Sequence, residues 1–192
     1  MKAVAMVIND WQLSGIWTAS TGGQYSVGFG YQNGGGNANL TGSPDYGARV
    51  YVIGDPGDGC NTSDLTKQFN TGAFKGPAVN SVGLESGTGY LTGCFQSTLD
   101  LSLARNIRLP HGRNIQLRVD MFNAPNEGRI TGRNTTMALT TPSDPLTITN
   151  SPFDPVTGAI AANRVRPNQA GFGQVNGYQG PRTIQAQIRF SF

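Results

Sequence analysis

Hydrophobic and polar residues alternate without a break over residues 182–192. Successive side chains of a β-strand point to opposite faces, so this run predicts a strand with one apolar and one polar face. The apolar series continues to the last residue and comprises Ile184, Ala186, Ile188, Phe190 and Phe192. Such a strand suits a half-buried soluble sheet, and equally a barrel wall with lipid on one side and a wet lumen on the other.

The same period of two returns in two neighbouring runs, 98–109 and 114–123. Each run has about ten residues, which is the length of a tilted strand that crosses a bilayer. The residues between them, "PHGR", predict a tight turn. The apolar face carries Leu99, Leu101, Leu103, Ile107, Leu109, Ile115, Leu117, Val119 and Met121, and the polar face carries Asp100, Arg108, Arg118 and Asp120, joined by Arg189 of the last run.

An earlier pair of runs, 11–20 and 24–31, surrounds a short Gly-containing segment. In the first run, Trp11 and Trp17 fall on the same face of a strand. The second run alternates aromatic or aliphatic residues with Gly and Ser. The two runs predict a hairpin. The alternative is that 24–31 forms the rising edge of a loop.

Two long segments, 32–97 and 124–181, are rich in Gly, Asn, Ser and Pro and show no sustained period. Loops of this length count against a compact soluble domain, but they are normal on the extracellular side of outer-membrane barrels. Four or five strands are also too few for a soluble sandwich around such loops. We therefore predict an all-β fold, an antiparallel meander that forms part of a transmembrane β-barrel with long extracellular loops. The side chains expected to face lipid are Leu99, Leu101, Leu103, Ile115, Leu117, Val119, Ile188 and Phe190.

Composition supports this fold and excludes some functions. Charged residues make up 13% of the 192 residues, against about 25% in typical soluble domains. The 27 glycines suit turns and loops better than helices. The net charge is only +3 and contains no basic run, so nucleic-acid binding has little support.

Cys60 and Cys94 lie in the same predicted loop. An oxidising compartment allows them to form a disulfide, and a ring of that size contributes roughly 4 kcal/mol in the chain-entropy model. Two free thiols are the alternative. A zinc site is not expected, because the one histidine, His111, sits in the tight turn.

Other candidate chemistry is weaker. Asp55, Asp58 and Asp64 could gather Ca²⁺, but their spacing does not match an EF-hand loop, and solvated turn residues are the favoured interpretation. Glu85 and Glu127 lie in separate loops and no nucleophile–base pair is evident, so neither an enzyme nor a cofactor is expected. The loop aromatics could stack on sugar or peptide ligands, or pack small cores of their own; they are Tyr46, Tyr51, Phe69, Phe74, Tyr90 and Phe95.

Six stretches resemble, in order, the C-terminal end of TonB-dependent outer-membrane receptors, and most closely the Oar-like group. They are "NDWQLSGIWTASTGGQYSV", "FNTGAFKGP", "STLDLSLARNIRL", "IQLRVDMFNAPN", "FGQV" and "GPRTIQAQIRFSF". The resemblance implies that residues 1–192 are the C-terminal segment of a 22-strand barrel, whose plug, TonB box and signal peptide lie outside this chain. It also implies an outer-membrane assembly signal in Ile188, Phe190 and Phe192.

The resemblance further implies uptake of a ligand across a bacterial outer membrane, with the TonB system engaged only through regions outside this chain. The alternative function is a non-transport structural or adhesive subunit whose long loops bind a partner. The expected partners are the remaining barrel strands or other protein chains, together with outer-membrane lipid. The identity of the ligand does not follow from these residues.

Overall fold

The computed structural model describes residues 10–31, 40–43, 46–153, 157, 159–160 and 171–192. Its elements are β1 (Trp11–Ser20), β2 (Gln24–Tyr25), β3 (Gly28–Tyr31), β4 (Tyr51–Val52), η1 (Thr71–Ala73), β5 (Phe74–Lys75), β6 (Leu91–Thr92), β7 (Gln96–Arg108), η2 (Pro110–Gly112), β8 (Asn114–Phe122), β9 (Ile130–Arg133), β10 (Thr136–Leu139), β11 (Val175–Tyr178) and β12 (Thr183–Ser191). Both η elements are short 3₁₀ turns. Within the described ranges, no helix has the length and apolar character needed to cross a membrane.

The chain divides into two compact units. Of the described residues, those in 10–20, 95–129 and 179–192 form the sheet unit, and those between 21 and 94 and between 130 and 178 form the loop unit. The sheet unit contains the four long strands, whereas the strands of the loop unit have two to four residues each.

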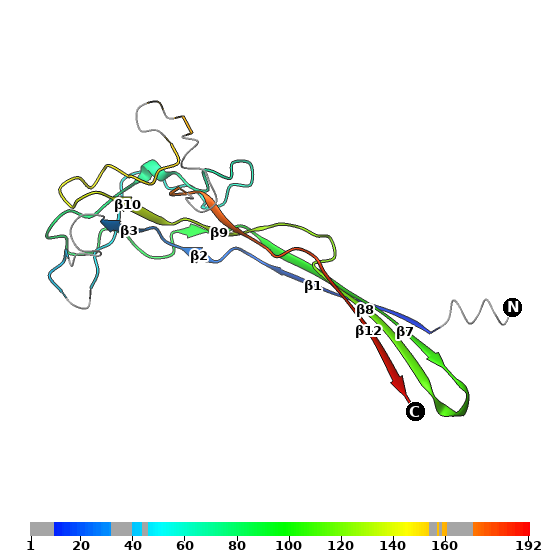
Figure 1. The fold of residues 1–192 in the computed structure, drawn as a ribbon. Coiled ribbons are helices and arrows are strands. Elements are labelled where there is room, and N and C mark those ends of the chain that lie inside the picture. Colours follow the sequence, from blue (N-terminus) through cyan, green and yellow to red (C-terminus); the bar gives the residue numbers. More distant parts are fainter. Residues whose placement is uncertain (1–9, 32–39, 44–45, 154–156, 158, 161–170) are drawn as a thin grey trace. The chain divides into compact units, whose positions relative to one another are not determined.

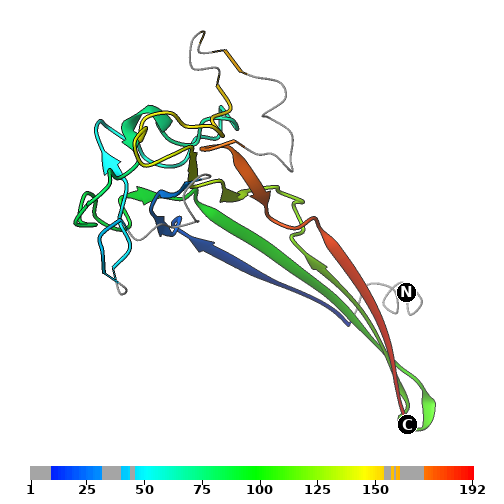
Figure 2. The same ribbon diagram turned by 60° about the vertical axis from the view of Figure 1, so that its left-hand side comes forward.

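The sheet unit is a four-stranded antiparallel sheet in the order β1-β7-β8-β12. Figures 1 and 2 show these strands running side by side along their whole length. The predicted all-β antiparallel fold is confirmed, and the four long strands begin and end within two residues of the predicted runs. Long period-two runs form strands here because each run presents one uniform face.

The register gathers the apolar residues on one face of this sheet. Leu13 pairs with Leu103, which pairs with Val119, which in turn pairs with Ala186. The face is not covered by other described residues: every residue of β1 and β12 is exposed, and Trp17 and Ile188 retain more than 60% of their accessible surface. A soluble protein rarely exposes so large an apolar face, but a barrel wall in lipid requires one.

The opposite face of the sheet is polar. Ser102 and Asp120 stand opposite each other in β7 and β8, and Arg118 forms a salt bridge of 2.9 Å with Asp120. The carboxylate of Asp100 accepts a hydrogen bond of 2.9 Å from the backbone N–H of Asn123. This face therefore suits the water-filled lumen of a barrel.

A tight turn at η2 joins β7 to β8. His111 and Gly112 both adopt positive φ, at 66° and 75°, and the N–H of Leu109 donates to the carbonyl of Arg113 over 2.8 Å. The ends of β1, β7, β8 and β12 that are remote from this turn carry the long connections. The turn side corresponds to the periplasmic side of a barrel, and the long connections correspond to the extracellular side.

The predicted hairpin between 11–20 and 24–31 is wrong. β1 pairs with β7, and the run 24–31 divides into β2, which pairs with β6, and β3, which pairs in parallel with β10. Gly22, between the two runs, lies against the backbone of Gly93: a Cβ at this position would be 1.7 Å from the carbonyl oxygen of Gly93. The run 24–31 belongs to the loop unit and not to the long sheet, which agrees with the alternative that it is part of a loop.

The loop unit has a hydrophobic core of its own. Phe69 contacts Phe74 and Phe172 edge-on, with ring centroids 5.8 and 5.2 Å apart. The buried core residues are Val27, Tyr31, Leu40, Val50, Phe69, Ala73, Phe74, Leu91, Met137, Leu139 and Phe172. Burial of this aromatic and aliphatic surface supplies the stability that the short strands lack.

Candidate functional site

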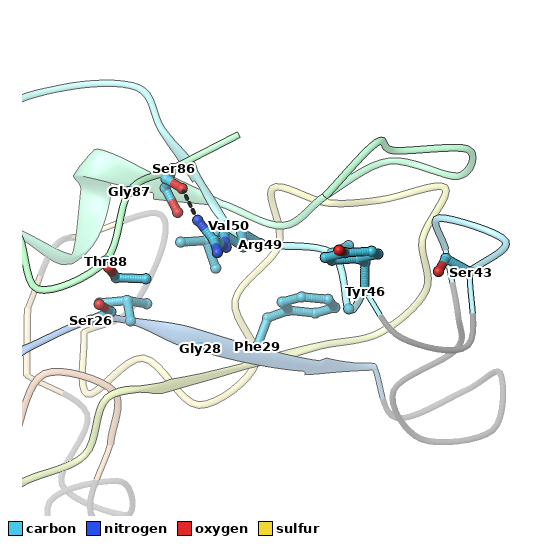
Figure 3. Close-up of a pocket in the computed structure, with 13 residues that line it drawn as sticks. Ser26, Gly28, Phe29, Ser43, Tyr46, Arg49, Val50, Ser86, Gly87 and Thr88 are labelled. Atoms are coloured by element: carbon cyan, nitrogen blue, oxygen red, sulfur yellow. Dashed lines mark hydrogen bonds between the residues drawn. The ribbon is translucent and has the colours of Figure 1, made fainter. Parts of the chain in front are cut away.

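The loop unit contains a pocket of about 380 Å³. Its walls come from three parts of the chain that are distant in the sequence: 26–29 at the start of β3, Ser43 with 46–50 before β4, and 86–88 before β6. Figure 3 shows the side chains of these segments converging on one space. The volume is within the range of small-molecule binding sites.

Aromatic and cationic groups line this pocket together. Phe29 and Tyr46 both contribute rings, and Tyr46 is 70% exposed, so its ring is free to contact a bound molecule. Arg49 donates a hydrogen bond of 3.0 Å from Nη1 to the carbonyl of Ser86, which ties the guanidinium to the wall (Figure 3). Ser26, Thr88 and several glycines add hydroxyl and backbone groups. These groups can stack on a ring and hydrogen-bond its substituents.

Hydrogen bonds from backbone N–H groups to side-chain hydroxyls hold one wall of the pocket. The hydroxyl oxygen of Ser26 accepts from the N–H of Gly89 over 2.7 Å, and that of Tyr90 accepts from the N–H of Val27 over 3.0 Å. Burial raises the pKa of Tyr90, and its hydrogen bonds with Val27 and Ser86 partly oppose that shift. These bonds join residues 63 positions apart in the sequence and fix the spacing of the pocket walls.

The predicted disulfide joins Cys60 to Cys94 in the structure, with Cα atoms 5.0 Å apart. Gln68, which is only 2% exposed, lies beside it: its amide nitrogen donates to the carbonyls of Asn61 and Asp64. Arg133 lies within 3.9 Å of the Cys94 sulfur. The disulfide therefore closes a ring of loop that side-chain hydrogen bonds also hold together.

Tyr25 lies in the same region as the disulfide. Its hydroxyl donates a 2.6 Å hydrogen bond to the carbonyl of Gly59, and the guanidinium of Arg133 lies 4.7 Å from the centroid of its ring. Burial raises the pKa of Tyr25 to about 12, an effect that the charge of Arg133 partly opposes. The hydrogen bond to Gly59 makes the phenol a structural donor.

The structure places two of the three aspartates that were considered for calcium in turns. Asp55 Oδ1 accepts from the N–H of Gly57 over 2.9 Å, and Asp64 Oδ1 accepts from both the N–H and the hydroxyl of Thr66. These bonds hold the pKa of Asp64 below its usual value. Among the described residues, no group of three His, Cys, Asp or Glu side chains is arranged to bind a metal ion.

The loop aromatics take different roles. Phe69 and Phe74 are 3% and 2% exposed and belong to the core, whereas Tyr46 faces the pocket. Lys75 lies over the ring of Tyr51, and Arg129 lies over the ring of Phe95 in the sheet unit. Tyr46 is thus the aromatic residue among those six that remains most available to a ligand.

Other residues singled out from the sequence lie in separate places. His111 occupies the turn η2, and Glu127 pairs with Arg129 over 2.6 Å. Ile188 and Phe190 lie in β12 on the apolar face, and Phe192 is fully exposed just beyond this strand. The pocket around Arg49 was not anticipated, because it depends on contacts between residues more than 30 positions apart, which leave no local pattern.

The sheet has one apolar face that suits lipid and one polar face, and its tight turn lies at the end opposite the long connections. These features define the class of protein: the chain is part of a transmembrane β-barrel. A model of the outer membrane beta barrel domain matches residues 1–185. The chain therefore belongs to this family, and its location is the bacterial outer membrane. No curated protein and no solved structure matches the chain.

Proposed function

We propose that the chain forms the C-terminal portion of a TonB-dependent receptor barrel, which takes up a scarce ligand across the outer membrane. The six ordered stretches that resemble this group of receptors support the proposal. Its plug and its contact with TonB lie in regions outside these residues. The chain has a binding and transport role in this account, and no catalytic one.

One observation carries the proposal: the two outer strands of the sheet each have a single neighbour. Among the described residues, β1 pairs only with β7, and β12 pairs only with β8. An unpaired strand edge costs several kcal/mol for each unsatisfied backbone group in lipid, and a closed barrel needs about eight strands. Further strands, from the same polypeptide or from other chains, therefore complete the wall.

The loop unit supplies the ligand contact in this proposal. A disulfide, a core and a defined pocket give it a fixed shape, and a fixed shape reduces the entropy lost when a ligand binds. Tyr46 and Arg49 are the side chains best placed to contact the ligand, because both are exposed and both line the pocket.

A specific observation also favours the alternative, a non-transport adhesive role. Val79, Val82 and Leu84 lie in one stretch of the loop unit and are 59–75% exposed. Exposed aliphatic side chains on an extracellular loop suit a protein partner. The two functions differ in whether a nutrient crosses the membrane.

The test compares deletion of this gene with deletion of tonB, on a panel of scarce nutrients supplied singly. The proposal expects one nutrient whose uptake falls in both strains. The wild-type gene should restore that uptake in the gene-deletion strain, while Tyr46→Ala restores less. A variant in the turn, His111→Ala, is the matched control and should restore uptake fully. If uptake of every nutrient is unchanged while cell adhesion is lost, the adhesive role replaces the proposal.

A further inference from the structure

Arg49 is the one charged side chain among the described residues that line the pocket of the loop unit. Its Nη1 donates a hydrogen bond of 3.0 Å to the carbonyl of Ser86, and its remaining N–H groups make no hydrogen bond to a described residue. No carboxylate in the described part of the chain lies within ion-pair distance of this guanidinium. The pocket therefore holds a positive charge that is tied to one wall and that an anionic ligand can neutralise.

Two aromatic rings accompany this charge. Figure 3 shows the rings of Phe29 and Tyr46 on one side of Arg49. Phe29 packs edge-on against Tyr31, with ring centroids 5.5 Å apart, and the buried Tyr31 donates a hydrogen bond of 2.6 Å to the carbonyl of Pro77. Tyr46 is 70% exposed and contacts no other ring of the described residues. One ring therefore belongs to a rigid wall, and the other is available to stack on a ligand.

Hydroxyl and backbone groups complete the lining. The hydroxyl oxygen of Ser26 accepts from the N–H of Gly89 over 2.7 Å, which leaves its own O–H to donate, and Thr88 is exposed. A Cβ at Gly47 or Gly87 would meet no atom within 4 Å, so a ligand can approach these two backbone segments closely. A sugar ring carries hydroxyls on most of its carbon atoms and can use many such groups, whereas a planar aromatic acid carries few. The lining therefore favours a sugar over an aromatic acid.

We propose that the pocket binds an acidic sugar, namely a uronic acid unit of an oligosaccharide. The planar guanidinium of Arg49 donates paired hydrogen bonds to the carboxylate, and the ring of Tyr46 stacks on the apolar face of the sugar. Ser26 and Thr88 bind the sugar hydroxyls. This inference rests on the proposed function, because that proposal makes this pocket the place of ligand contact, and it adds the chemical class of the ligand.

Calorimetric titration of the native full-length protein in detergent micelles tests this inference. The probes are the trimers of galacturonate, mannuronate and glucuronate, each compared with its methyl ester, which keeps the sugar ring and removes the charge. The proposal expects at least one acidic trimer to bind, and its methyl ester to bind roughly ten-fold or more weakly. Benzoate, a planar anion without hydroxyls, should not displace the bound trimer.

Variants then assign the recognition to the two side chains. Arg49→Gln should lower the affinity for the acidic trimer to that of its methyl ester and leave the affinity for the ester unchanged. Arg49→Lys should retain part of the difference, which guards against a simple folding defect. Tyr46→Ala should weaken the binding of both the acid and the ester. Arg189→Gln changes an arginine on the polar face of the sheet and is the matched control, so it should change neither affinity.

The inference is overturned if no acidic trimer binds, or if each acidic trimer and its ester bind equally well. An equal loss of acid and ester binding in Arg49→Gln would show that Arg49 only holds the wall of the pocket. Displacement of the trimer by inorganic phosphate or by benzoate would show a site for small anions instead of a sugar site.

The results separate this inference from the transport proposal. If no acidic trimer binds but one nutrient still requires both this gene and tonB for uptake, the ligand class is wrong and transport stands. If an acidic trimer binds through Arg49 but its uptake is unchanged in both deletion strains, the sugar site stands and transport of that sugar is excluded.

Discussion

Phe190 of β12 stands directly opposite Ile115 of β8, and the two side chains lie on the apolar face of the sheet. Phe190 is 66% exposed, although it is a large aromatic residue. Two positions on, Phe192 continues the apolar series beyond the end of the paired strand. The apolar face therefore reaches the turn side of the sheet, where we expect it to serve as the signal for barrel assembly.

Phe192 is expected to govern assembly. Phe192→Ser should lower the amount of folded protein in the outer membrane several-fold, because it ends the apolar series with a polar group. The amount is measured as the heat-modifiable band of the outer-membrane fraction. Ser191→Ala, on the other face of the same strand, is the control and should assemble normally. Equal assembly of the two variants would contradict an assembly signal that ends at Phe192.

Loss of the disulfide should destabilise the loop unit. Replacing both Cys60 and Cys94 with serine frees the unfolded loop, at a cost of up to about 4 kcal/mol in the chain-entropy model. Limited proteolysis should then cleave within 21–94 at lower denaturant concentration, while the sheet unit keeps its resistance. Unchanged cleavage would mean that the core around Phe69 and the hydrogen bonds of Gln68 hold the loop without the disulfide.

Gly59 and Gly57 offer a matched pair of backbone tests. Both have positive φ, at 94° and 76°. A Cβ at Gly59 would lie 2.8 Å from the Tyr25 hydroxyl and from the carbonyl oxygen of Thr92, whereas a Cβ at Gly57 meets nothing within 4 Å. Gly59→Ala should therefore cost more than the roughly 1–3 kcal/mol of backbone strain that both variants share. Thermal unfolding of the loop unit measures the difference, and equal melting temperatures would argue against the packing around Tyr25.

Alkaline pH should destabilise the loop unit through Tyr25. Its pKa is raised from 10.0 to about 12 in the folded protein, so the unfolded state loses the phenolic proton first. The stability that this group contributes is fully present below about pH 10 and is lost as pH rises toward 12. Unfolding followed over this range should show a shallower decline in Tyr25→Phe. Burial also raises the pKa of Tyr31 and Tyr90, so the decline should not vanish. A Tyr25→Phe profile identical to wild type would contradict this assignment.

The long strands were predictable because their alternation is strict and local. In the run at 98–109, a strand is the conformation that places all the leucines on one face. The structure forms strand β7 over this run. The run at 24–31 has the same alternation but does not join the long sheet. Its apolar side chains, among them Val27 and Tyr31, are buried in the core of the loop unit. Alternation of apolar and polar residues indicates that one face of a strand is apolar. It does not indicate whether lipid or protein covers that face.

The pocket was beyond prediction for a related reason. Its walls combine Ser26, Arg49 and Thr88, which lie far apart in the sequence of the loop unit, where β2 pairs with β6, β3 with β10 and β4 with β5. These strands have two to four residues each and carry no periodic signal. The disulfide was predictable, because its two cysteines had only each other as partners in the sequence.

The central claim is that β12 has a second neighbour in a wall larger than these four strands. A photo-crosslinking amino acid at Gln187 tests it most directly, because Gln187 lies mid-strand, opposite Arg118 of β8. Crosslinked peptides from intact outer membranes are identified by mass spectrometry. The account predicts two products, one with the β8 peptide and one with a strand outside residues 1–192. Crosslinks to β8 alone, or to β8 and β1 of the same chain, would contradict it.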